Sequence, residues 1–418
     1  MTIAALEALS FGLGRMAAAA ADAGHRLCLL TGDRGVYRHE LAQLAPDALD
    51  IVDLDTRDQD ACRAALARLP DLRGLINSTD TWSVPGADLA AELGLPGPDP
   101  AAVRVLRDKS RVRNLLHGNG LSRGRAHAVR PGPGAAKEVL ETVGLPAVLK
   151  DTSGTSSRNV WIARDEARLS AALAEAAERP FMGRLFAEPY VAGPVYSAET
   201  LSWAGRTRLL GVLSRQISPE PFVREEASAF PVAHPAAELD GLATWVARVL
   251  DVAGHDQGFA HVEYVLTAEG PELVEINRRI GGALVGEALC RSLGVNVYDA
   301  LVATALGRRP DLLDGPGHTG PATGFVLVYP DRAGTLTGWS GLDTLDAFPG
   351  SPEWYPTMSP GDRIAHLNDQ RGCTGILLAE AATAELALHR ALSAAGSVRP
   401  QVTPRVTPEA PAGPVSHP

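Results

Sequence analysis

The chain has 418 residues, of which 45% are hydrophobic and 21% are charged. That balance is typical of a soluble globular protein and excludes a largely disordered chain. The formal net charge is −10, which disfavours nucleic acid as a partner, because binding to a phosphate backbone needs clustered Lys and Arg. No run approaches the ~20 apolar residues of a membrane span, so we expect no membrane partner.

Four cysteines are scattered along the chain without CxxC spacing or nearby histidine pairs: Cys28, Cys62, Cys290 and Cys373. The pattern argues against both a zinc site and a disulfide framework. We therefore expect a cytoplasmic protein, with enough chain for a sizeable core and an inter-domain cleft.

The first hundred residues alternate short apolar runs with helical patterns. The apolar runs predict four strands, at residues 3–9, 26–30, 50–54 and 74–77. Residues 15–23 and 58–69 hold helix-forming residues without proline and predict crossover helices. Because a βαβα order implies a parallel sheet, we expect an N-terminal parallel α/β domain.

A segment rich in glycine and proline, residues 94–100, marks the first domain boundary, and a basic helix is expected over 103–117. Strands and helices then alternate over residues 121–308. Hairpin-like pairs at 186–202 and 259–276 indicate a mixed or antiparallel sheet.

Toward the C-terminus, residues 322–329 and 375–379 predict strands and 384–392 predict a helix, which indicates a small α/β domain. Prolines then recur with almost no large apolar residues, which predicts a disordered tail. The expected regions are an N-terminal domain (1–104), a first lobe with a linker helix (105–190), a second lobe (191–310), a C-terminal domain (311–396) and the tail (397–418).

The strongest chemical signal is a pair of glutamates on two strands joined by a short turn, Glu263 and Glu275. Buried paired carboxylates repel unless a cation separates them, and such ligands suit Mg²⁺, which also bridges nucleotide phosphates. Asn277 shares a strand face with Glu275 and adds a neutral oxygen. The alternative, a hairpin with two exposed glutamates, explains the pair but not Asn277, Arg279 and the double glycine that follows.

A second signal is Lys150, which ends an apolar strand and leads into a small, hydroxyl-rich loop over 151–160. The lysine offers a point charge to phosphate oxygens, and the loop, with Ser156 and Ser157, offers backbone N–H groups. A surface hairpin with an ordinary lysine is the alternative. No GxxxxGK[ST] sequence occurs, so the loop is not a Walker P-loop.

A third signal is a strand that reaches a hinge containing proline and glycine, with Glu188, Tyr190 and Val191. Backbone donors and acceptors exposed there in an apolar setting suit an adenine edge. A plain strand–turn–strand explains the segment as well.

Taken in order, these features resemble the ATP-grasp superfamily over about residues 105–308. The resemblance implies a two-lobed α+β core after the parallel α/β domain, with ATP and Mg²⁺, or Mn²⁺ in its place, as cofactors. The positions that match the family's nucleotide and metal residues are Lys109, Lys150, Glu188, Val191, Glu263, Glu275, Asn277 and Arg279. Arg279 and Lys150 are expected to act on the transferring phosphoryl group.

Three departures from the family pattern stand out. Val195 occupies a position where an acidic residue often meets the ribose, which leaves the ribose contact open. The loop has one glycine, with Ser156 and Asn159 where glycines are common; Asn tolerates left-handed backbone angles, so the loop is still expected to form. Arg278 replaces the usual proline before the motif arginine.

With the C-terminal region included, the chain resembles bacterial L-amino-acid ligases, which make dipeptides and related antibiotic or siderophore amides. The resemblance implies an ATP-dependent carboxylate–amine ligase that forms an amide through an acyl phosphate and releases ADP and phosphate. Arg215 is expected to pair with a substrate carboxylate and Glu226 with an amino group, although solvated charges on a loop explain both residues equally. Gly281 and Gly282 are expected to let the backbone approach the substrate.

Two other functions stay open at this point: biotin-carboxylase-like activation of bicarbonate, and a nucleotide-binding protein without catalysis. No biotinyl-lysine motif or second repeat supports the first, and the retained lysines, glutamates and Arg279 argue against the second. The partners expected are small molecules, namely amino acids or related carboxylates and amines. The oligomeric state is not determined, with a homodimer as one option.

Overall fold

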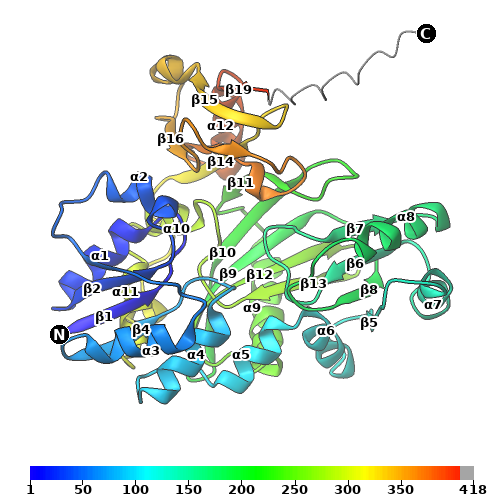
Figure 1. Cartoon of the computed structure of the whole chain (residues 1–418), viewed down its shortest axis with the longest axis horizontal. Coiled ribbons are helices and arrows are strands. Elements are labelled where there is room, and N and C mark those ends of the chain that lie inside the picture. Colours follow the sequence, from blue (N-terminus) through cyan, green and yellow to red (C-terminus); the bar gives the residue numbers. More distant parts are fainter. Residues whose placement is uncertain (405–418) are drawn as a thin grey trace, which may run out of the picture.

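The computed structural model describes residues 1–404 of the chain. Figure 1 shows a parallel α/β region at the N-terminus (blue), two central lobes (cyan to green) and a C-terminal region (yellow to red) at the top of the view. The predicted fold class, an α/β protein with an ATP-grasp-like α+β core, is confirmed by this arrangement.

The N-terminal sheet is entirely parallel, in the order β3-β2-β1-β4. Its strands are β1 (Thr2–Leu6), β2 (Arg26–Thr31), β3 (Asp50–Asp53) and β4 (Leu72–Ile76). Its helices are α1 (Leu13–Asp22), η1 (Arg34–Tyr37), α2 (Arg38–Leu41), α3 (Gln59–Arg68) and α4 (Ser83–Glu92). Every residue of β1 is buried, as a strand covered on both faces requires.

Two helices link this region to the lobes: α5 (Pro100–Arg107) and α6 (Lys109–Gly118). The prediction of one helix over 103–117 is wrong, because Asp108 is extended (φ −103°, ψ 97°) and breaks the pattern. Its carboxylate accepts a hydrogen bond from the Arg111 backbone N–H at 3.0 Å and so caps α6. The cap places Lys109 in the first turn of α6.

The first lobe is an antiparallel sheet in the order β5-β8-β6-β7. Its elements are β5 (His127–Ala128), α7 (Ala135–Thr142), β6 (Ala147–Asp151), β7 (Val160–Ala163), α8 (Glu166–Ala177) and β8 (Leu185–Pro189). Val139 of α7 and Leu169 of α8 pack with Leu149 of β6 in one buried cluster. Lys150 therefore emerges beside a firmly packed strand residue.

The second lobe contributes to an eight-stranded sheet of order β13-β12-β9-β10-β11-β14-β18-β16. The elements of this lobe are β9 (Val195–Trp203), β10 (Arg206–Ile217), β11 (Glu225–Phe230), α9 (Ala236–Val252), β12 (Gly258–Thr267) and β13 (Gly270–Asn277). The predicted hairpin over 259–276 is confirmed as β12 and β13. The predicted hairpin over 186–202 is wrong: β8 and β9 lie in different sheets, because residues 190–194 carry the chain from one lobe to the other.

The C-terminal region extends the same large sheet and adds a small one of order β17-β15-β19. It is preceded by α10 (Val285–Leu293), α11 (Tyr298–Ala305) and η2 (Asp311–Asp314), of which α10 and α11 lie beside the N-terminal region in Figure 1. Its own elements are β14 (Ala322–Val328), β15 (Gly334–Ser340), η3 (Leu342–Ala347), β16 (Glu353–Pro356), β17 (Arg363–Ile364), η4 (Gln370–Gly372), β18 (Gly375–Ala381), α12 (Ala384–Ala395) and β19 (Arg399–Thr403). Strand β11 pairs with β14, so no break separates this region from the second lobe.

The predicted disordered tail begins too early. Residues 399–403 form β19, an edge strand that pairs with β15. Pro400 is tolerated there because an edge strand does not need every backbone N–H. Residues 405–418 of the predicted tail lie outside the described residues.

One buried cluster joins regions that are far apart in the sequence. It contains Phe11 of the N-terminal region, Leu289 of α10, Tyr298 of α11, Phe325 of β14 and Leu378 of β18. The N-terminal and C-terminal regions are thus fixed on a shared core. No helix within residues 1–404 combines the length and apolarity needed to cross a membrane.

Candidate active site

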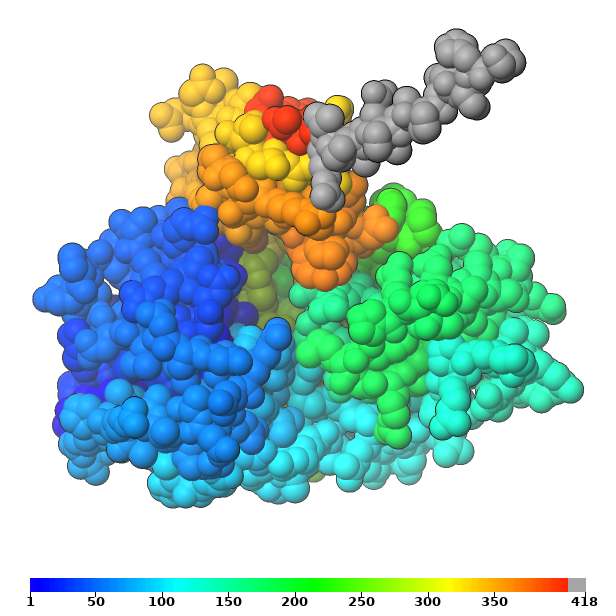
Figure 2. All heavy atoms as spheres, in the orientation of Figure 1, coloured from blue at the N-terminus to red at the C-terminus, as the bar shows by residue number. Residues whose placement is uncertain are grey.

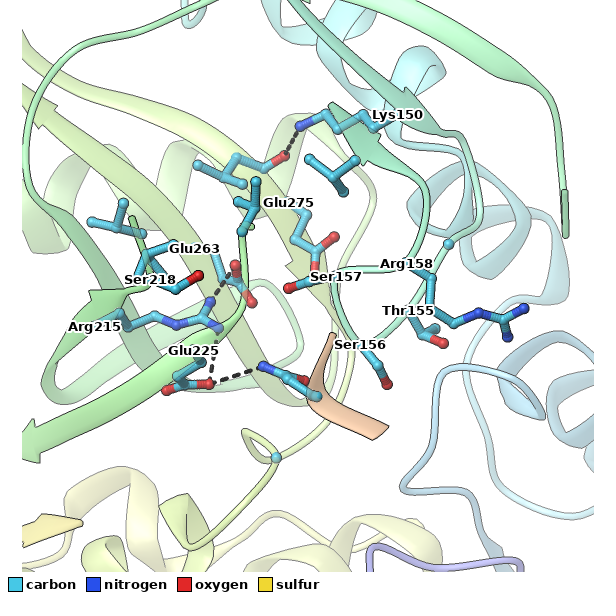
Figure 3. A pocket seen from close by; sticks show the side chains of 18 of the residues that line it. Lys150, Thr155, Ser156, Ser157, Arg158, Arg215, Ser218, Glu225, Glu263 and Glu275 are labelled. Atoms are coloured by element: carbon cyan, nitrogen blue, oxygen red, sulfur yellow. Dashed lines mark hydrogen bonds and ion pairs between the residues drawn. The ribbon is translucent and has the colours of Figure 1, made fainter. Parts of the chain in front are cut away.

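A cavity of about 650 Å³ lies where the regions meet. Figure 2 shows the hollow between the N-terminal region (blue) and the lobes (green), beneath the C-terminal region (orange). We call its two sides the lobe side, lined by Lys150, residues 154–158 and residues 188–191, and the junction side, lined by residues such as Phe11, Arg215, Arg279 and Cys373. Glu263 and Glu275 also line this cavity, and Figure 3 shows them close to both Arg215 and the 154–158 loop.

Two lysines reach the lobe side from different elements. Lys150 Nζ lies 2.5 Å from Glu188 Oε1. Lys109 Nζ lies 2.9 Å from Glu275 Oε2 and donates to the Gly154 carbonyl at 2.6 Å. Both lysines line the cavity, where each ammonium group can offer its charge to an anionic ligand.

Arg113, which the sequence analysis did not identify, forms an ion pair with Glu188. Its Nε donates to Glu188 Oε2 at 2.9 Å and its Nη1 to Glu272 Oε1 at 2.6 Å, and all three side chains are buried. Burial opposes ionisation of Glu188, but Arg113 and Lys150 outweigh it and keep the pKa of Glu188 below its ordinary value. Arg113 lies one helical turn after Lys109 in α6, a spacing that places both side chains on one helix face.

The loop after β6 adopts left-handed backbone angles at three non-glycine residues: Ser156 (φ 57°), Ser157 (φ 58°) and Asn159 (φ 55°). Such angles cost a residue with a Cβ about 1–2 kcal/mol. Asn159 is anchored by its Nδ2, which donates to the Pro180 carbonyl at 2.9 Å. The loop therefore forms despite its single glycine, and Ser156 and Ser157 line the cavity.

The hinge that joins the lobes also lines the lobe side, at Tyr190, Val191 and Val195. The Arg164 guanidinium lies 4.6 Å from the centroid of the Tyr190 ring and 2.5 Å from Glu220 Oε1. Glu220, in the loop after β10, lines the same cavity. Glu220, which the sequence analysis did not identify, thus places a carboxylate on the side of the cavity where Val195 has no acidic group.

Glu263 and Glu275 are direct register partners across β12 and β13. Glu275 pairs with Lys109, and Glu263 pairs with Arg215. Burial opposes ionisation of Glu263, but Arg215 and His261 outweigh it and hold its pKa well below the ordinary range. The carboxylate of Glu263 is therefore charged.

The donor set of this pair fits a hard divalent cation. Asn277 Nδ2 donates a hydrogen bond to Glu275 Oε1 at 2.8 Å, so the amide lies beside the two carboxylates. Its oxygen is a third possible metal ligand. Two carboxylates and an amide oxygen are ligands that Mg²⁺ accepts when phosphates and water complete its shell. Within residues 1–404 no group of three or more His, Cys, Asp or Glu forms a competing metal site.

His261 contacts both Glu263 and Glu199, and neither His261 nor Glu199 was among the predicted site residues. His261 Nδ1 lies 2.6 Å from Glu199 Oε1, and its Nε2 lies 3.3 Å from Glu263 Oε1. Burial lowers the pKa of His261, but the two glutamates outweigh it and raise the pKa to about 9. The protonated ring thus ties Glu263 to β9.

Arg279 faces the cavity and Arg278 does not. Arg279 Nε donates to Asp80 Oδ2 at 2.7 Å, whereas Arg278 Nη2 donates to the Gln257 carbonyl at 3.1 Å, away from the cavity lining. Burial opposes ionisation of Asp80, but Arg279 outweighs it and keeps the pKa of Asp80 below its ordinary value. Asp80 follows the carboxyl end of the parallel strand β4. A polar residue at such a position is typical of a ligand site, and this signal could have identified Asp80 from the sequence.

Glu226, which was predicted to meet the substrate, does not line the cavity, whereas its neighbour Glu225 does. Only 7% of the Arg215 side chain is exposed, and it pairs with Glu225 Oε2 at 3.1 Å; Glu225 lines the cavity (Figure 3). Glu226 is outside the lining and pairs with Arg224 at 3.4 Å. Adjacent strand residues face opposite ways, and a bulge at Gln216 sets which of the two glutamates points inward.

The two glycines have different roles. A Cβ on Gly281 would lie 2.8 Å from His261 Nδ1 and 2.8 Å from the Val285 side chain, so only glycine allows this packing. Gly282 lines the cavity, and the nearest atom to a Cβ there is Arg279 Nη1 at 3.9 Å. Of the pair, Gly282 is the one that a substrate can approach.

Residues 143–287 match the ATP-grasp domain, and residues 326–403 match the L-amino acid ligase C-terminal domain 2. The chain therefore contains an ATP-grasp domain followed by an L-amino acid ligase C-terminal domain. The two matched regions identify it as an ATP-grasp ligase of the carbon–nitrogen bond-forming, carboxylate–amine class, as the sequence resemblance predicted.

An uncharacterised protein of Sinorhizobium fredii, y4rH, is 25% identical over 84% of this chain and 73% of its own length. Carnosine synthase 1 of Homo sapiens is 27% identical over 79% of this chain, which spans only 42% of that ligase. The solved L-amino acid ligase of Bacillus licheniformis shares the fold, with a TM-score of 0.80 at 20% identity over 96% of this ATP-grasp chain and 98% of that one.

Proposed function

We propose that this ATP-grasp protein activates the carboxylate of one amino acid as an acyl phosphate and joins it to the amine of a second small molecule. The observation that carries the proposal is the Glu263–Glu275 pair, which faces one cavity with Lys109 and Lys150. The same cavity is lined by Cys373 and other residues of the region matched to the L-amino acid ligase C-terminal domain 2.

ATP would occupy the lobe side. Lys109 and Lys150 offer their charges to the phosphates, and the loop with Ser156 and Ser157 offers backbone N–H groups. Tyr190 and Val191 of the hinge suit the adenine edge, and the buried Glu188 keeps Lys150 in place. Because position 195 is valine, we assign the ribose hydroxyls to Glu220 instead.

Glu263, Glu275 and Asn277 would hold Mg²⁺, which when bound neutralises the charge of the triphosphate. In the structure, Lys109 and Arg215 neutralise the two carboxylates. Arg279 then supplies a planar pair of donors to the phosphoryl oxygens on which negative charge develops.

The reaction balances in two displacements. A substrate carboxylate oxygen attacks the terminal phosphorus of ATP, the bond from that phosphorus to its bridging oxygen breaks, and ADP leaves. The amine of the second substrate attacks the acyl carbon, the carbon–oxygen bond to the phosphate breaks, and phosphate leaves as the nitrogen loses a proton. The 154–158 loop, closed over the phosphates, would keep water from the acyl phosphate.

ADP release measured with pools of amino acids, with bicarbonate and with neither tests the proposal. We expect release only with amino acids, together with an amide product seen by mass spectrometry. Release with bicarbonate alone would indicate a biotin-carboxylase-like activity. Tight ATP binding without release in any arm would indicate a nucleotide-binding protein without catalysis.

We also propose a reducing compartment, the cytoplasm, since all four cysteines are free and buried. Small-molecule partners follow from the size of the cavity. A homodimer stays a prediction, which mass measurement in solution would test.

A further inference from the structure

The junction side of the cavity carries an apolar wall. Five of its lining residues, from four segments of the chain, belong to one buried cluster: Phe11, Val285, Leu327, Cys373 and Ile376. Each is less than a tenth exposed. A ligand group that reaches this wall leaves water for a close-packed apolar surface, which stabilises it by about 25 cal/mol per Å².

The charged groups beside this wall are held in ion pairs. Arg215 pairs with Glu225 and Glu263, and Arg279 pairs with Asp80. A charged ligand side chain placed among them would either lack a partner or separate an existing buried pair, and both are costly.

A chain of contacts links the wall to the reacting centre. Glu263 pairs with Arg215, and Arg215 lies 3.1 Å from Glu225. Gln370 Nε2 donates to the same Glu225 oxygen at 3.3 Å, and the Cys373 backbone N–H donates to the Gln370 carbonyl at 3.1 Å. Figure 3 shows Arg215 between Glu263 and Glu225. The wall around Cys373 and the carboxylate of Glu263 therefore belong to one connected side of the cavity, within reach of a single ligand.

We infer that this wall selects the amino acid whose carboxylate is activated, and that it selects for an uncharged, apolar side chain, with Cys373 setting its maximum size. The inference rests on the proposed function. Cys373 is suited to that limit because its side chain is small and is held by a hydrogen bond from Sγ to the Gly375 carbonyl at 3.2 Å. Larger residues at this position would fill the space that the substrate side chain needs.

Hydroxylamine isolates the activated amino acid, because it attacks the acyl phosphate in place of the amine substrate and gives a hydroxamate. Hydroxamate formation is measured with glycine, alanine, valine, leucine, methionine, aspartate and lysine. We expect the apolar amino acids to exceed aspartate and lysine in kcat/KM by at least about a hundredfold, since an apolar wall does not replace the water that a charged side chain loses.

The variant Cys373→Met should lower kcat/KM for leucine and methionine by about tenfold or more, because even one methylene in an apolar pocket changes kcat/KM by about 10–200-fold. Glycine and alanine should be affected least. Cys373→Ala should retain or improve the larger substrates. Cys290→Ala is the matched control, because Cys290 is buried in the same cluster but does not line the cavity.

Two results would overturn the inference alone: aspartate or lysine activated as well as leucine, or Cys373→Met lowering the rate for every amino acid equally. Those results would leave the ligase proposal standing, since hydroxamate still forms. Absence of hydroxamate and of ADP release with every amino acid would overturn both.

Discussion

The lobe side and the junction side of the cavity differ in how the chain builds them. Apart from Lys109, the predicted nucleotide residues lie between Lys150 and Val191, within one lobe and its hinge. The junction side draws on residues from Phe11 to Ile376, brought together by the N-terminal region, the second lobe and the C-terminal region. Under the proposed function, the difference teaches that nucleotide binding is a local property of the chain, whereas substrate recognition needs the whole fold.

The largest effect is expected where the two sides meet. Glu275→Gln should abolish turnover while the fold survives, because it removes one charge from the pair that would hold Mg²⁺ against the triphosphate. ADP release at limiting magnesium and circular dichroism measure the two parts. Glu269→Gln, an exposed change on the same hairpin, is the control and should be silent. Near-wild-type turnover of Glu275→Gln would contradict the metal assignment, and with it the view that the lobe side and the junction side meet at a metal site.

Arg279→Lys tests the junction side alone. A lysine cannot supply the planar pair of donors, and loss of one fixed donor costs about a hundredfold to a thousandfold in rate. ATP binding should change little, because Lys109 and Lys150 remain. Steady-state kinetics on Arg278→Lys gives the contrast, since Arg278 points away from the cavity. A severe loss in Arg278→Lys with a mild one in Arg279→Lys would reverse the assignment.

Ser156→Val tests the lobe side alone. A β-branched residue at φ 57° adds backbone strain of about 1–3 kcal/mol, so the KM for ATP should rise by about tenfold, with little change in the preference among amino acids. Ser156→Gly, which removes the strain, should bind ATP at least as well. If Ser156→Val instead alters amino-acid preference, the two sides are not separable in the way the comparison requires.

The smallest effect concerns stability and the buried His255, which lies between α9 and β12. Burial lowers the pKa of His255 to about 3, first by desolvation and then by the charge of Arg278. The folded pKa lies below the unfolded value of 6.5, so this group stabilises the fold above pH 6.5, and that stability is lost as pH falls toward 3, by about 1.4 kcal/mol per pH unit. Denaturant unfolding of His255→Gln between pH 7 and pH 4 should give a shallower slope. If His255→Gln left the slope of unfolding free energy against pH unchanged, titratable groups other than His255 would account for the pH dependence of stability.

The lobe side was largely predictable from the sequence because its signals are local. Lys150 at a strand end, the hydroxyl-rich loop and the Glu263–Glu275 spacing each follow from strand periodicity over a few residues. Asp80, Arg113 and Glu225 were not found, since each acts through a residue distant in sequence: Arg279, Glu188 and Arg215. The choice of Glu226 over Glu225 shows the limit most clearly, because a single bulge reverses which side chain points inward.

The pairing of β11 with β14, from Ala227 opposite Val326 to Phe230 opposite Thr323, has a consequence for protein engineering. Exchange of the C-terminal region between related ligases is an obvious route to new products. A graft that starts at residue 326 would cut through the middle of this hydrogen-bonded ladder and leave an exposed strand edge, which favours aggregation. A graft that starts before β14 at Ala322 keeps that strand whole, and it succeeds only if the donor strand preserves the register with β11.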